Sequence, residues 1–190
     1  MGGRRRQRIR TWAEELVALH GADVARMVGL DGPLPDVRID VQPAGPPGLT
    51  SGLTITLSEA WFAEHPDDAG CVIHELAHAY MRAPRYDDTT VWLIEGLADH
   101  VRDTLGLEAS WTFAHFEAGK ATAGYQTTAD FLAWLDGRDP GASVELCRRL
   151  IADTYDEGAF GDIAGRPLTD LVAAYEADRS RSAPGPTLTA

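Results

Sequence analysis

Two short segments in the first third of the chain alternate apolar and polar residues. In DVRIDVQ (36–42) and in LTITLS (53–58), every second residue is a valine, isoleucine or leucine. A period of two is typical of β-strands with one buried face. A loop rich in proline and glycine, PAGPPGLTSG, joins the two segments. We therefore predict that they pair as a small antiparallel sheet.

Apolar residues at helical spacing occur before these strands, over residues 11–30. Thr11 and Glu14 form a capping-box pair, which predicts that an amphipathic helix starts at Thr11. Five arginines lie in the first ten residues, and we expect residues 1–10 to be a flexible basic leader. The end of the chain, from residue 179 to 190, has the composition of a disordered tail. Residues 11–178 then form one domain, large enough for a single hydrophobic core.

After the strands, the apolar pattern is helical only. One helix is expected to have Pro66 as its first residue and to stop before Pro84, because proline suits a helix start and disfavours a helical residue before it. Thr89 or Thr90 can cap the next helix, which Gly106 ends. The sequence thus predicts an α+β fold, with a small antiparallel sheet followed by a mainly helical region. Further helices are predicted over 109–118, 128–136, 142–155 and 167–178.

The charge of the chain restricts its partners. There are 17 basic and 29 acidic residues, which give a formal net charge of −12. Without the five N-terminal arginines, 12 basic residues face 29 acidic ones, so the body carries about −17. Such a body repels nucleic-acid phosphates, and we expect no nucleic-acid partner.

The chain carries no recognisable export or membrane segment. The basic start MGGRRRQRIRTW is not followed by the apolar stretch that a signal peptide needs. No run approaches the roughly 18 apolar residues of a membrane span. Its two cysteines, Cys71 and Cys147, fit a reducing compartment. We therefore expect a cytoplasmic protein without a membrane partner.

The segment CVIHELAHAY, residues 71–80, contains the first candidate site. On a helix, His74 and His78 project from one face on successive turns and can bind one zinc ion. Glu75 lies about 100° round the helix from His74, where it can take a proton from a zinc-activated water. The H-E-x-x-H pattern also arises by chance, and histidines on an apolar helix are often core residues.

A catalytic zinc needs a third protein ligand, and WLIEGLADHVRD (92–103) contains a candidate. Glu95 lies seventeen residues after His78, on the next predicted helix, and a short loop returns that helix toward the first. Its apolar neighbours would make an unpaired carboxylate costly. Asp99, one turn later on the same face, is placed to accept the outer N–H of a zinc-binding histidine.

These segments resemble those of known zinc peptidases. HELAH followed by EGLAD is similar to the gluzincin arrangement, in which the glutamate of the second helix is a zinc ligand. Over about residues 35–178, the segments ITLSEAWF, VIHELAHAY, WLIEGLADHVRD and GYQTTADFLAWL resemble the basic secretory protein family of plant and bacterial peptidases. This resemblance implies a zincin-like domain in which the two ligand-bearing helices pack together. It also implies one Zn²⁺ per chain bound by His74, His78 and Glu95, with Glu75 as general base.

The chain differs from that family in two places near the motif. Family members follow the second histidine with an aromatic and glutamine-containing run, where this chain has Ala79, Tyr80 and Met81. The tyrosine of the family's A-D-Y segment is His100 here. The chain is also acidic, not basic. These differences leave the implied zinc ligands in place and bear on substrate and location.

Hydrolysis of an amide also needs a group that stabilises the oxyanion of the tetrahedral intermediate. Tyr125, in GYQTTADFL just before a predicted helix, is our candidate. A core tyrosine with a hydrogen-bonded hydroxyl is an equally good interpretation of that residue. His100 and His115 are weaker candidates.

We therefore predict a zinc-dependent metallopeptidase that acts on a peptide or protein substrate. Two alternatives remain: a zincin-like binding module without turnover, and a zinc hydrolase of a non-peptide amide or ester, for which water activation is the same. Zinc peptidases commonly bind an extended substrate along the edge of a sheet. We accordingly expect the strand at 53–58 to be the accessible edge beside the cleft.

Overall fold

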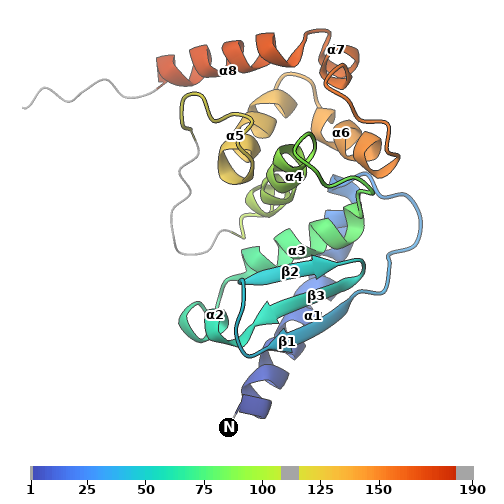
Figure 1. The fold of residues 1–190 in the computed structure, drawn as a ribbon, viewed down its shortest axis with the longest axis vertical. Helices are drawn as coiled ribbons and strands as arrows, with labels where there is room; N and C mark the ends of the chain where they lie inside the picture. Colours follow the sequence, from blue (N-terminus) through green and yellow to red (C-terminus); the bar gives the residue numbers. More distant parts are fainter. Residues whose placement is uncertain (1, 108–115, 183–190) are drawn as a thin grey trace, which may run out of the picture.

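A computed structural model describes residues 2–107 and 116–182 of the chain (Figure 1). The helix expected at 109–118 falls almost entirely outside these ranges, and so does His115. Within them the fold is α+β, as predicted, with one small sheet and eight helices. In chain order the elements are α1 (Gly2–Met27), β1 (Arg38–Gln42), β2 (Gly48–Ser51), β3 (Thr54–Ser58), α2 (Glu59–Glu64), α3 (Ala69–Met81), α4 (Val91–Thr104), α5 (Tyr125–Asp136), α6 (Ala142–Ile151), α7 (Ala159–Ala164) and α8 (Leu168–Ser182).

The sheet is mixed, with the strand order β1–β3–β2. β3 runs parallel to β1, with Ile39 opposite Ile55, and antiparallel to β2. The prediction that 36–42 and 53–58 form an antiparallel pair was wrong. The reason is β2, which lies inside the expected loop. The chain reverses direction before β2 and again after it, so β3 runs in the same direction as β1. Gly52, at a φ of +58°, makes the tight turn between β2 and β3.

The strand order also corrects the prediction about the sheet edge. β3 is the central strand, because β1 pairs with one side of it and β2 with the other. The strand at 53–58 therefore presents no free edge to a substrate, and that prediction was wrong. Within the described residues, β2 is the outer strand on the side of the candidate site.

Helix α1 starts earlier than the capping pattern indicated. It is helical from Gly2, so Thr11 lies in its interior and does not cap it. Ile9 is buried, and an ion pair between Arg6 and Glu59 (3.7 Å) connects the first turns of α1 to α2. The start at Thr11 was therefore wrong, because contacts with the body extend the helix through the arginine-rich segment.

Helix α3 begins three residues later than predicted. Pro66 is not its first residue. Asp68 is the N-cap, and its carboxylate accepts a hydrogen bond of 3.0 Å from the N–H of Cys71. The helix ends at Met81, before Pro84, as predicted. Thr90 directly precedes α4, but its hydroxyl donates to the carbonyl of Arg85 and makes no cap bond.

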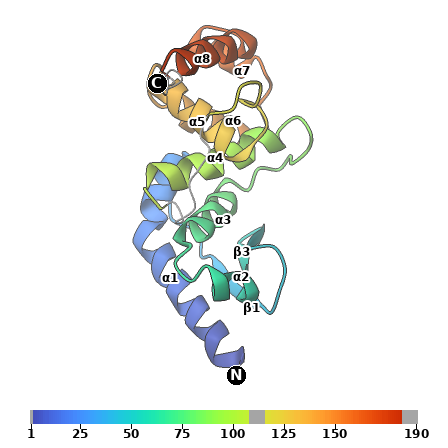
Figure 2. The same cartoon turned by 90° about the vertical axis from the view of Figure 1, so that its left-hand side faces the viewer.

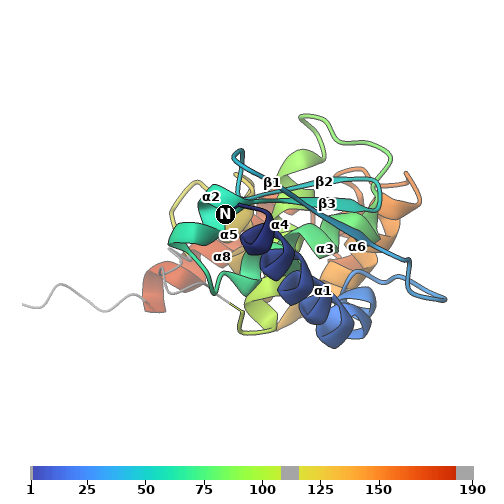
Figure 3. The ribbon, with the colours of Figure 1, turned by 90° about the horizontal axis from the view of Figure 1, so that it is seen from below.

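The helices pack one on another in succession away from the sheet. α1 and α3 lie on the same side of the sheet, which Figure 3 shows from below. α4 packs on α3, and α5 packs on α4, so that α5 to α8 form the end of the molecule farther from the sheet (Figure 2). None of the helices in the described ranges is long and apolar enough to cross a membrane.

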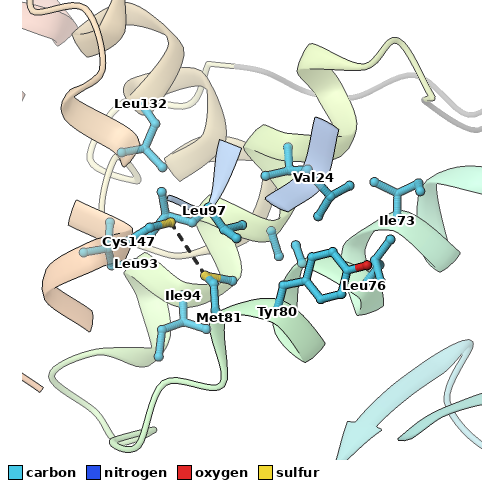
Figure 4. Close-up of a cluster of buried hydrophobic side chains, with 14 of the residues drawn as sticks. Val24, Ile73, Leu76, Tyr80, Met81, Leu93, Ile94, Leu97, Leu132 and Cys147 are labelled. Atoms are coloured by element: carbon cyan, nitrogen blue, oxygen red, sulfur yellow. Dashed lines mark hydrogen bonds between the residues drawn. The ribbon is translucent and has the colours of Figure 1, made fainter. Parts of the chain in front are cut away.

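The hydrophobic core includes side chains from α1 and from α3 to α6, some of which Figure 4 shows. Met81 from α3 and Cys147 from α6 are fully buried there, with their sulfur atoms 3.8 Å apart. Leu93 and Leu97, one turn apart on α4, are also fully buried in this core. This core fixes α4 against α3, and those two helices carry the candidate site.

Candidate metal centre

His74 and His78 lie on successive turns of α3, with their rings 4.6 Å apart between centroids. The two Nε2 atoms are 3.0 Å from each other. Both side chains are only partly exposed, and both line a cleft of about 790 Å³. The four-residue spacing thus brings both imidazole nitrogens to one point of the cleft wall.

Glu95 reaches the same point from α4. One of its carboxylate oxygens lies 3.3 Å from His74 Nε2, and the other lies 3.5 Å from His78 Nε2. The three side chains form a group that could hold a metal ion, with donor atoms within 4.8 Å of one another. Around a tetrahedral zinc with bonds of about 2.0–2.1 Å, donor atoms lie roughly 3.3 Å apart. The donor set and its spacing therefore fit zinc.

Asp99 contacts the far side of the His74 ring. Its Oδ1 lies 2.7 Å from Nδ1 of His74, and the side chain of Arg102 approaches the same oxygen at 3.2 Å. The carboxylate favours a proton on Nδ1, so Nε2 is the nitrogen of His74 that is available to bind a metal ion.

The electrostatics of this group favour positive charge. Burial alone lowers the pKa of His74, but hydrogen bonds with Asp99 and Glu95 outweigh it and raise that pKa to about 9. Burial raises the pKa of Glu95, yet its contacts with His74 and His78 outweigh this and hold it well below its usual range. The carboxylates around His74 thus stabilise a cation at this position.

The glycine of EGLAD allows α4 to approach α5 closely. A Cβ on Gly96 would collide with the side chain of Thr128. Thr128 is itself fixed, because its hydroxyl accepts from Gly124 N–H and donates to the Ala121 carbonyl, both at 2.9 Å. Since Gly96 follows Glu95 directly, this close contact fixes the part of α4 that carries Glu95.

Glu75 is 8% exposed and lines the cleft beside His74. Its carboxylate oxygen Oε2 accepts a hydrogen bond of 2.7 Å from the hydroxyl of Thr50 on β2. A Cβ on Gly48 would lie 2.5 Å from Cγ of Glu75, so any larger residue there would displace the Glu75 side chain from this position. The edge strand β2 therefore contacts Glu75 of the H-E-x-x-H motif through both Thr50 and Gly48. Neither contact could be predicted from the sequence, because both involve β2, which lies in the segment expected to be a loop.

Two tyrosines line the cleft near the two histidines and Glu95. Tyr125, at the start of α5, is 56% exposed, and its ring is nearly parallel to that of His74 at 6.3 Å. Tyr86, in the loop before α4, donates its hydroxyl to Glu95 Oε1 at 2.5 Å. Burial and the neighbouring Glu95 raise the pKa of both phenols, so both hydroxyls keep their protons at neutral pH. Tyr86 was not predicted from the sequence. The only feature that could have indicated it is its position in the short loop between α3 and α4, the two helices that carry the candidate ligands.

Two other residues considered from the sequence take no part in the group. His100 is buried and lies 3.0 Å from Asp136, which also accepts a hydrogen bond from Ser143. It does not line the cleft. Cys71 does line it, but burial raises its pKa, so the thiol stays protonated, and it is not part of the candidate metal group.

Comparison with known proteins identifies the family. Residues 48–175 match the family described as peptidase of plants and bacteria. The matched segment spans more than half of the chain and includes β2, the two histidines, Glu95 and Tyr125. The chain belongs to this family, which confirms the resemblance to the basic secretory proteins. No curated protein and no solved structure matches the chain.

Proposed function

We propose that the protein is a zinc-dependent peptidase in which His74, His78 and Glu95 hold one Zn²⁺. The observation that carries this proposal is the convergence of two imidazoles and a carboxylate, from two helices, at donor distances of 3.0–3.5 Å. Three protein ligands leave a fourth position open, as in catalytic zinc sites. Membership of a peptidase family supports the peptidase part of this proposal.

Bound zinc is a Lewis acid, which acidifies a water molecule and polarises the carbonyl group of the scissile bond. The surrounding side chains orient the ligands. Asp99 keeps His74 in the tautomer that offers Nε2, given the 2.7 Å contact on Nδ1. Tyr86 donates to Glu95 and restricts the rotation of that carboxylate.

Glu75 is the proposed general base. It follows His74 directly on α3, lines the same cleft and is not needed as a ligand. It takes the proton from the attacking water and then gives a proton to the leaving amine nitrogen. Tyr125 is the candidate that donates to the developing oxyanion, because its exposed, protonated phenol faces the cleft beside His74.

Strand β2 is the proposed binding edge for the substrate backbone. The N–H of Ser58, at the end of β3, donates to the carbonyl of Pro47, just before β2, so these two residues form a hydrogen-bonded pair. Hydrogen-bonded and non-hydrogen-bonded pairs alternate in antiparallel strands, so the pairs Gly48–Leu57 and Thr50–Ile55 are not hydrogen-bonded. The N–H and C=O groups of Gly48 and Thr50 then point outward, where an extended peptide can pair with them.

The decisive experiment compares wild type with Glu75→Gln. Protein purified without chelators is analysed for zinc, and both forms are incubated with a diverse peptide library that is read by mass spectrometry. We expect one zinc per chain in both forms. We also expect cleavage by wild type only, since losing a general base typically costs about 10²–10⁴-fold in rate.

Other outcomes select the alternatives. Zinc without any peptide cleavage would favour a binding module or an enzyme that hydrolyses a non-peptide amide or ester. Absence of zinc, or full zinc content in a His74→Ala/His78→Ala variant, would contradict the metal centre itself. Equal cleavage by both forms would remove Glu75 from the mechanism.

A further inference from the structure

We propose that Thr50 is a positioning residue for the general base, so that one edge strand both aligns the substrate and holds Glu75. The inference rests on the proposed function, because it assigns a partner to the base of that reaction. Glu75 is the residue that must be aimed most accurately, since it has to reach one water molecule and later the leaving nitrogen.

The hydroxyl of Thr50 lies between two acceptor atoms of Glu75. Oγ1 of Thr50 lies 2.7 Å from Glu75 Oε2 and 3.0 Å from the main-chain oxygen of the same glutamate. Among the described residues, Thr50 provides the only hydrogen bond to the Glu75 carboxylate. The side chain would otherwise rotate about three bonds, so this contact selects one of its conformations.

The second observation is the shape of the strand around that carboxylate. Gly48 and Thr50 are two residues apart, so they face the same side of the sheet. A Cβ on Gly48 would lie 2.5–2.9 Å from the side-chain atoms of Glu75. β2 thus combines a gap that admits the carboxylate with a hydroxyl that binds it. A chance hydrogen bond between Thr50 and Glu75 would not require a glycine at position 48 to leave room for the Glu75 side chain.

The side chain and the backbone of Thr50 have separate roles. Its N–H and C=O groups point out of the sheet edge toward the substrate, whereas its hydroxyl points toward α3 and binds Glu75. Removing only the hydroxyl leaves the backbone edge intact. It follows that kcat should fall while KM stays nearly the same.

The experiment compares Thr50→Val, Thr50→Ser and Thr56→Val with wild type. Valine keeps the branched shape that suits a strand and lacks the hydroxyl, and serine keeps the hydroxyl. Thr56 is the matched control, because it pairs with Leu49 and so lies on the opposite face of the same sheet. For each protein, zinc content, melting temperature, kcat and KM are measured on one peptide that wild type cleaves.

We expect Thr50→Val to lose roughly tenfold to a hundredfold in kcat, as a slightly misplaced catalytic group does, with KM, zinc content and melting temperature near wild type. Thr50→Ser should recover most of the loss, and Thr56→Val should behave as wild type. A Thr50→Val enzyme with wild-type kcat, or a Thr50→Ser enzyme as slow as Thr50→Val, overturns the proposal.

A structural measurement separates this inference from the proposed function. If zinc-loaded wild type cleaves no peptide, the proposed function fails, but crystal structures of wild type and Thr50→Val still test the role of Thr50. We expect the Glu75 carboxylate to leave β2 in Thr50→Val and to remain there in Thr50→Ser. An unchanged Glu75 conformation in Thr50→Val contradicts the inference whatever the activity.

Discussion

The carboxylate of Asp99 lies 2.7 Å from Nδ1 of His74, the ring nitrogen that does not face Glu95. Asp99 comes from α4, one turn after Glu95, and His74 comes from α3. One helix therefore supplies both a candidate zinc ligand and the group that orients a second ligand on its neighbour. Asp99 is buried and His74 is little exposed, so losing this contact would leave a polar group poorly solvated.

Asp99→Asn should weaken zinc binding. The amide keeps the shape of the carboxylate and removes the charge that makes His74 a better donor, and losing such a partner typically costs about 10–100-fold in metal affinity. Competition with a chromogenic chelator measures the dissociation constant. Asp103→Asn, one turn further along α4 and partly exposed, is the control and should bind zinc as wild type does. Equal affinities for the two variants would remove Asp99 from the metal centre.

Removing zinc should destabilise the fold, because the ligands come from two different helices. A ligand that binds only the folded state contributes about 4 kcal/mol at a free concentration of 1,000 times its dissociation constant. A strong chelator should therefore lower the melting temperature of wild type measured by calorimetry. His78→Ala, which lacks a ligand, should melt at the same temperature with and without chelator. A wild-type melting temperature that ignores the chelator would argue against the proposed site.

The sequence was most informative where a local spacing determines the geometry. On a helix, residues four apart share a face, so His74 and His78 were expected side by side, and their Nε2 atoms are 3.0 Å apart. The apolar neighbours of Glu95 correctly indicated a buried position, since that residue is 6% exposed. Both inferences need only the helical period and the cost of burying a charge.

The sequence was least informative where the position depends on distant contacts. β2 has four residues, with Leu49 exposed, so it shows neither the length nor the alternation that predicts a strand. Its pairing with β3 determines that β3 is central and brings Thr50 to Glu75. Tyr86 lies in a loop, where no period relates it to Glu95. Such contacts appear only after the elements have packed together.

Gly96→Ala should disturb the site through the packing of α4 on α5. The added methyl group collides with Thr128, and overpacking of this kind typically costs about 1–3 kcal/mol. We expect a lower free energy of unfolding in urea and weaker zinc binding, because the shift of α4 carries Glu95 with it. Gly161→Ala is the matched control: a Cβ there meets no atom within 4 Å, and alanine favours the helix α7. If the two variants are equally stable, the close approach at Gly96 is not needed.

The two tyrosines at the cleft should have separable roles. Tyr86 donates to Glu95, so Tyr86→Phe should weaken zinc binding along with activity. Tyr125 stacks beside His74 through its ring, which phenylalanine retains, so Tyr125→Phe should bind zinc normally. If the phenol of Tyr125 stabilises the oxyanion, kcat should fall roughly 10²–10³-fold with little change in KM. Parallel measurements of the zinc dissociation constant, kcat and KM distinguish these outcomes. Wild-type kcat in Tyr125→Phe, together with reduced kcat in zinc-saturated Tyr86→Phe, would instead assign the oxyanion to Tyr86.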